Sequence, residues 1–248
     1  MMRIAHASID ERNQARNGTA GNQTGKEVCI RQWYNKPWTV LIHHPDRIVR
    51  EKIATMAEAL ASPPANTLIG YDQNERNTFH AISKFCGYDV LEFIGCRTEC
   101  ETDCSAFVTT VCLYAGVKTL EYTGNAPTTS TMKSVFKKAG FDIITDKKVL
   151  NTTAYLSKGD ILVKPGAHTV IVIDDGALYG KPSSKSYFPK CSPNHTSIAQ
   201  ALDEIGVDSS KSNRKLIYNA NYTDTYRYTA KQNTAMLTLL KDGKLLRP

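Results

Sequence analysis

The segment Thr102–Ala115 constrains the fold of this chain more than any other stretch of its sequence. Phe107, Val108 and Val111 recur in it at the spacing of one helix face. Gly116 follows directly, and glycine is common just after the last turn of a helix. The pattern predicts a helix whose apolar side packs inside a domain, so neighbouring segments must cover it.

Shorter segments on both sides also have helical periodicity. In the longest of them Ile48, Ile53 and Leu60 lie near helical spacing, and Pro63-Pro64 stops the pattern. The predicted helices are Asp46–Leu60, Arg76–Phe85 and Thr131–Ala139.

Runs rich in β-branched and aromatic residues predict two hairpins. One pair of runs is joined by Asn35-Lys36-Pro37 and the other by Pro165-Gly166, and both sequences favour turns. The predicted strands are Val28–Tyr34, Trp38–Ile42, Asp160–Val163 and His168–Ile173, with a further short one near Leu178 and Tyr179. Helices followed by an antiparallel sheet predict an α+β domain.

The composition changes after the predicted sheet. Residues 180–194 are rich in Pro, Ser and Lys and have no periodicity, which is typical of a linker. Three short apolar faces follow, and about fifty residues in three helices can fold as a small module. We therefore predict a first domain over residues 1–180, a linker over 181–195 and a mostly helical module over 196–248.

Charge and hydropathy exclude several classes of protein. No apolar run reaches the ~18 residues that span a bilayer, and the N-terminus turns polar before the ~7-residue apolar core of a secretory signal forms. The net charge of +7 favours a polyanionic partner, either nucleic acid, anionic lipid or an acidic cell wall. The basic residues are scattered, and no zinc-finger spacing or aromatic RNA-binding signature occurs, which disfavours specific nucleic-acid binding.

Seven cysteines leave at least one thiol free if the others pair. Cys96, Cys100 and Cys104 repeat every four residues, whereas structural zinc sites more often use C-x₂-C pairs, which this sequence lacks. A disulfide such as Cys96–Cys100, or free thiols, is favoured over bound zinc. We expect neither a metal nor another cofactor.

Cys104 lies at the start of the predicted helix, where unpaired N–H groups and the helix dipole favour negative charge. Its thiolate is expected to form more readily than that of a free cysteine, whose pKa is about 8.5. The alternative is a buried structural cysteine, because unreactive buried thiols are common.

His168 begins the last predicted strand and shares a strand face with Val170, Val172 and Asp174. If this sheet packs against the cysteine helix, the imidazole can accept the thiol proton. The remaining histidines lack such a setting and are interpreted as surface or packing residues: His6, His43, His44, His80 and His195.

These segments together resemble the NlpC-type papain-like cell-wall hydrolases. Members carry D-C-S-x-F/L-V at a helix start, then a G-D-L/I strand, then a histidine that opens the next strand; Thr102–Val108, Gly159–Leu162 and His168–Val172 match in that order. Gly25–Val28 and Gly70–Gln73 are similar to the phage and prophage endolysin branch. The resemblance covers roughly residues 5 to 180.

The resemblance implies a compact α+β catalytic domain with Cys104 as nucleophile and His168 as general base. A polar third residue orients the histidine in this family, and it stays open here. Asp174 is a candidate, although it lies about 20 Å from His168 along an extended strand and needs a bulge to reach it. Tyr71 is a candidate active-site tyrosine, with simple packing as the alternative.

The C-terminal module faintly resembles LysM-like wall-binding repeats, although the opening strand of such a repeat is missing. Its tyrosines could stack on sugars or form a core: Tyr218, Tyr222, Tyr226 and Tyr228.

The resulting hypothesis is an endolysin-type peptidoglycan hydrolase that cleaves an amide bond in the peptide part of the wall. A stem or cross-link endopeptidase is favoured, and an N-acetylmuramoyl-L-alanine amidase is the alternative. A non-catalytic wall-binding protein is the alternative from another class. We expect accumulation in the host cytoplasm, release when the membrane is breached, and attraction of the +7 charge to anionic wall polymers.

Overall fold

A computed structural model describes residues 1–178, 187–222 and 224–247. The chain divides into two compact units, residues 1–179 and 180–248, each with its own hydrophobic core. In the described part of the chain, no helix combines the length and the apolar character that crossing a membrane requires.

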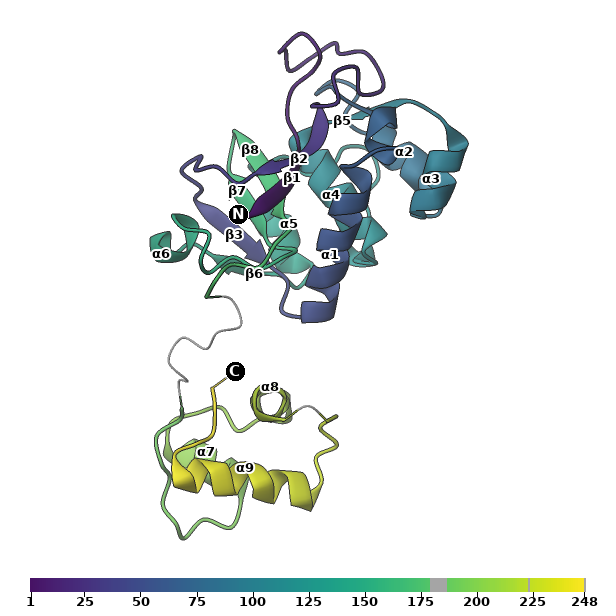
Figure 1. Cartoon of the computed structure of the whole chain (residues 1–248). Helices are drawn as coiled ribbons and strands as arrows, with labels where there is room; N and C mark the ends of the chain where they lie inside the picture. Colours follow the sequence, from purple (N-terminus) through teal and green to yellow (C-terminus); the bar gives the residue numbers. More distant parts are fainter. Residues whose placement is uncertain (179–186, 223, 248) are drawn as a thin grey trace. The chain divides into compact units, whose positions relative to one another are not determined.

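The first unit is built on a six-stranded antiparallel sheet (Figure 1). Its order is β2-β1-β8-β7-β3-β6, so the strand nearest the N-terminus pairs with the last strand of the unit. The strands are β1 (Arg3–Ala7), β2 (Val28–Gln32), β3 (Val40–His43), β6 (Asp142–Ile144), β7 (Ile161–Lys164) and β8 (His168–Val172).

Helices cover one face of this sheet. Helix α4 (Cys104–Tyr114) packs against β8 and against α1 (Arg47–Leu60), and all of its residues are buried. It is therefore a central helix, not the one-sided helix that its spacing predicts. The other face of the sheet holds a second cluster around Trp38, Val170 and Val172. The remaining helical segments of this unit are η1 (Ala65–Leu68), α2 (Thr78–Phe85), α3 (Val90–Cys96), η2 (Lys118–Leu120), α5 (Met132–Lys138) and α6 (Lys147–Leu150).

A short parallel pair of strands leads directly into α4. β4 (Ile69–Tyr71) pairs with β5 (Cys100–Thr102), so that Tyr71 lies opposite Thr102. Since Thr102 is two residues before Cys104, this pairing fixes Tyr71 beside the start of α4.

The predicted α+β class, the four predicted helices and the hairpin of β7 and β8 are confirmed. The predicted hairpin between residues 28–34 and 38–42 is wrong. Both strands exist, but β2 pairs with β1, whereas β3 pairs with β6 and β7. Strand β1 was not predicted, because it is short and its partners are distant in sequence. Leu178 lies in a turn and not in a third strand, and Tyr179 lies outside the described residues.

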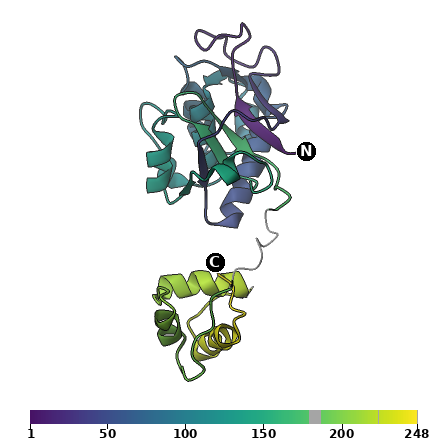
Figure 2. The ribbon, with the colours of Figure 1, turned by 90° about the vertical axis from the view of Figure 1, so that its left-hand side faces the viewer.

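The second unit consists of three helices around a small core, as predicted (Figure 2). They are α7 (Ile198–Glu204), α8 (Lys211–Asn221) and α9 (Ala230–Asp242). The unit includes part of the segment predicted as a linker: Phe188 and Cys191 are buried in its core, and the Phe188 N–H donates to the Leu245 carbonyl. Residues 180–186 of that segment lie outside the described residues.

Candidate active site

The first turn of α4 is fixed by the carboxylate of Asp103. Its Oδ1 accepts hydrogen bonds from the backbone N–H groups of Ser105 at 2.9 Å and Ala106 at 2.8 Å. Such N-capping satisfies donors that a helix start leaves unpaired. Cys104 is thereby held as the first residue of the helix.

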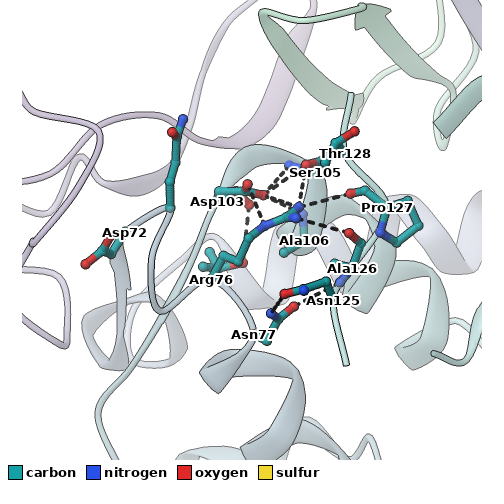
Figure 3. A network of polar contacts seen from close by, with 12 residues as sticks. Asp72, Arg76, Asn77, Asp103, Ser105, Ala106, Asn125, Ala126, Pro127 and Thr128 are labelled. Carbon is teal, nitrogen blue, oxygen red and sulfur yellow. Dashed lines mark hydrogen bonds and ion pairs between the residues drawn. The ribbon is translucent and has the colours of Figure 1, made fainter. Parts of the chain in front are cut away.

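Arg76 links this turn to the segment 125–128 (Figure 3). Its guanidinium lies 2.7 Å from Asp103 Oδ2 and donates to the carbonyl of Ala126 at 3.0 Å. It also donates to Ser105 Oγ at 2.8 Å. The side chain is buried, so these contacts are shielded from water and hold segment 125–128 against the start of α4.

The Cys104 thiol lies at the edge of β8. Pairing between β1 and β8 ends at Ala5 opposite Ile171, and the backbone N–H of Thr169 donates to Cys104 Sγ. The cysteine sulfur is therefore next to the residue that follows His168. Only 6% of Cys104 is exposed.

Burial raises the pKa of Cys104 to about 12, and the charge of Asp103 adds to this effect. The N–H groups of Thr169 and Ser105 and the charge of Arg76 oppose it. The expected lowering of the thiol pKa by the helix start is therefore not found, because loss of hydration outweighs the nearby donors. At neutral pH the sulfur carries its proton and requires a base for activation.

His168 faces a second histidine. Its Nε2 lies 3.1 Å from Nδ1 of His6 on β1, the two rings meet edge to face, and Trp38 stacks on His168. Burial lowers the pKa of His168 to about 4 and that of His6 to about 3. Lys36 and Arg31 lower both further, so both imidazoles are neutral at neutral pH.

The interpretation of His6 as a residue without such a setting is therefore corrected. It is 1% exposed and lies on the strand beside His168. The alternation of Ile4, Ala5, His6 and Ala7 is compatible with a strand, but their partner strand begins more than 160 residues later. Among the other histidines, His43 binds the buried Asp160 at 2.7 Å.

A second thiol lies on the far side of His6. Cys29 Sγ on β2 is 3.7 Å from His6 Nε2, and the two residues are opposite each other in the β1–β2 register. Cys29 lines a cavity of about 650 Å³ together with His6 and Arg31. His6 therefore contacts both His168 and a partly exposed cysteine.

The two other candidate residues have different surroundings. Tyr71 is buried, and both burial and the nearby Cys104 raise its pKa, so its ring lies close to the thiol. Asp174 follows the opposite end of β8 and binds the guanidinium of Arg3 at 2.7 Å. No bulge brings Asp174 to His168 in the regular strand 168–172, because each residue advances the chain by about 3.3 Å.

A cleft of about 400 Å³ opens over Cys104. Its lining includes Gln73, segment 128–130 and Gly166, whose N–H donates to Thr129 Oγ at 3.1 Å. Cys104 is part of the same lining.

All seven cysteines are free thiols, so the Cys96–Cys100 disulfide does not occur. Cys96 ends α3, Cys100 begins β5 and Cys104 begins α4, which distributes the four-residue repeat over three elements. The described residues contain no group of three His, Cys, Asp or Glu side chains arranged to hold a metal ion.

Comparison with known proteins identifies one family. Residues 4–179 match the family model described as an endolysin-like domain. No curated protein and no solved structure matches the chain.

Proposed function

The chain belongs to the endolysin-like domain family over residues 4–179, and on this premise we propose that it is a cysteine-dependent hydrolase of the papain-like NlpC type. Membership of this family supports a cell-wall-lytic role with peptidoglycan as substrate. The observation that carries the proposal is the thiol of Cys104 at the edge of β8, next to Thr169, which directly follows the buried neutral histidine His168.

In the proposed mechanism His168 removes the thiol proton as Cys104 attacks the scissile carbonyl. Burial keeps the His168 imidazole neutral at neutral pH, so it has a lone pair for the proton, and burial keeps the Cys104 thiol protonated. Because the imidazole is a weaker base than the thiolate, the proton is transferred while the carbon–sulfur bond forms and not before it. The imidazolium then protonates the leaving amine, and water attacks the acyl-enzyme with the same histidine as base. The reaction therefore consumes only the amide and water, and the two side chains return to their starting states.

We assign His6 as the residue that positions His168. Because His6 occupies Nε2 of His168, the Nδ1 atom is left for the thiol proton. Both rings are neutral, so this contact fixes the tautomer and orientation of His168 without adding a charge.

The oxyanion requires at least two donors, and Cys104 N–H is one of them. The N–H groups of Ser105 and Ala106, which follow in the same helix turn, are bound by Asp103 and cannot be the second donor. The side-chain amide of Gln73, which lines the same cleft, is therefore the proposed second donor.

For the second unit we propose attachment to the cell wall through charge. Residues 180–248 contain 11 Lys and Arg against 5 Asp and Glu, so they carry +6 of the net +7. Sugar stacking is a weaker explanation, because Tyr218 and Tyr226 are buried and stack on each other at 4.6 Å. Sedimentation of the full chain with purified walls is expected to weaken with salt and in the Lys211→Gln/Lys215→Gln variant; binding unaffected by both would contradict this role.

The catalytic proposal is tested with purified sacculi, the wild type and Cys104→Ala, and mass spectrometry of the released fragments. Cut stem or cross-link peptides identify the favoured endopeptidase, and free peptides beside intact glycan identify an amidase. Either activity must be lost in Cys104→Ala. If the wild type sediments with walls but releases nothing, a non-catalytic wall-binding protein is the better account.

A further inference from the structure

The cleft over Cys104 carries one positive charge that no acidic group neutralises. Three charged residues line it: Arg16, Arg76 and Asp103. Arg76 and Asp103 neutralise each other at 2.7 Å, and both are buried. Arg16 is exposed, and among the described residues its side chain has no ion-pair or hydrogen-bond partner.

The backbone around Arg16 is nevertheless tied to the site. The Ala15 carbonyl accepts from the Gln73 N–H at 2.9 Å, and the Asn17 side chain accepts from the Asn74 amide at 2.8 Å. The Arg16 carbonyl itself accepts from the Arg12 guanidinium at 2.8 Å. Arg16 is therefore presented at the cleft from a segment that is fixed on both sides to the chain leaving β4.

The rest of the cleft is polar and uncharged. Its described lining residues include hydroxyl groups of Ser105 and of segment 128–130 and the amide of Gln73, and Ala167 has the largest apolar side chain among them. Such a surface favours an extended polar segment over an apolar one. The planar guanidinium of Arg16 is matched to a carboxylate, which it can bind through two parallel hydrogen bonds.

We infer that Arg16 binds a free carboxylate of the wall peptide next to the scissile amide and thereby selects carboxylate-bearing over amidated stems. This inference rests on the proposed function and names the substrate feature that the same site recognises.

The test uses two soluble wall peptides that differ only in one carboxylate, which is free in one and amidated in the other. Wild type is expected to cleave the carboxylate form with about tenfold or higher kcat/KM, mainly through KM, as one charge-assisted contact implies. Arg16→Gln is expected to remove this preference by lowering kcat/KM for the carboxylate peptide to about the value for the amidated one. Lys52→Gln, which removes the same charge from an exposed position on α1, is the matched control and should keep the preference.

Calorimetric binding of both peptides to full-length Cys104→Ala, with and without Arg16→Gln, separates this inference from the catalytic proposal. A carboxylate preference in binding that depends on Arg16 supports the inference even if no peptide is cleaved. The inference would be overturned if Arg16→Gln weakened binding of both peptides equally, or if the preference for the carboxylate peptide stayed unchanged. The inference would also be overturned if the protein bound both peptides equally and a glycerol-phosphate oligomer displaced them. That result would indicate a phosphate ligand.

Discussion

The two ends of strand β8 differ in the charge of their side chains. At its start His168 is packed against His6 and Trp38, and burial keeps both imidazoles neutral. Two residues beyond its end, Asp174 is partly exposed and pairs with Arg3, which also binds Glu58. Burial therefore keeps the proposed base His168 uncharged, whereas Asp174 at the other end has an ordinary structural partner in Arg3.

The largest expected difference between the two ends is in catalysis. His168→Ala is expected to lower wall hydrolysis by about 10²–10⁴-fold, the range for loss of a general base. Asp174→Ala should stay within about threefold of wild type, because its contacts are surface ion pairs. Turbidity loss of a wall suspension measures both. If Asp174→Ala lowered wall hydrolysis as much as His168→Ala, Asp174 would contribute to the reaction and not only to a surface ion pair.

The second expected effect concerns His6. His6→Ala is expected to lower kcat by about 10–100-fold, as for a residue that orients a catalytic group. KM should change little, and His6→Asn should restore part of the rate by contacting Nε2 of His168. The acid limb of the rate profile should move from near pH 4 toward the ordinary histidine value, because the cavity left in His6→Ala hydrates His168. An unchanged acid limb together with a lower melting temperature would leave His6 with a packing role only.

The third difference is in stability against acid. The folded pKa values of His6 and His168 lie below the ordinary value of 6.5, so the unfolded chain binds more protons between about pH 4 and pH 6.5. The free energy of unfolding is therefore greatest above pH 6.5 and falls by the order of a few kcal/mol as the pH drops to 4. Urea unfolding at pH 7 and pH 4.5 measures this, and His6→Asn should flatten the dependence.

The smallest expected effect is at the other end of β8. The pKa of Asp174 is lowered chiefly by its hydrogen bonds to Arg3, so its stabilising contribution is present above the ordinary carboxyl value and is lost below it. Both partners are partly exposed, and Asp174→Asn should cost less than about 1 kcal/mol at pH 7. A cost of several kcal/mol in urea unfolding would mean that this ion pair is far less screened than its exposure indicates.

Local signals in the sequence predict the helices, the β7–β8 hairpin and the place of Cys104 at the start of α4. The N-cap of Asp103, the apolar spacing of α4 and the turn at Pro165-Gly166 each act within a few residues, so a single chain reveals them. The resemblance to endolysins, carried by Gly25–Val28 and Gly70–Gln73, agrees with the endolysin-like family model over residues 4–179.

The contribution of His6 could not be predicted in the same way. It depends on β1 pairing with β8, a contact between segments that no local pattern connects. Because β1 is not predicted, the sequence pattern pairs β2 with β3, whereas β2 pairs with β1 and β3 with β7. The raised pKa of Cys104 was also unpredictable, because a helix position says nothing of how completely the neighbouring elements exclude water.

The proposed role of Cys104 as nucleophile is tested by identifying the thiol that carries the acyl group. Wild-type protein is mixed with a soluble wall peptide, the reaction is quenched in acid during turnover, and the adduct is mapped by proteolysis and mass spectrometry. Cys29 is a second candidate in such a map, since its thiol lies 3.7 Å from His6. We expect the acyl adduct on Cys104, unchanged in Cys29→Ser and absent in Cys104→Ala. An adduct on Cys29, or continued hydrolysis by Cys104→Ala, would contradict it.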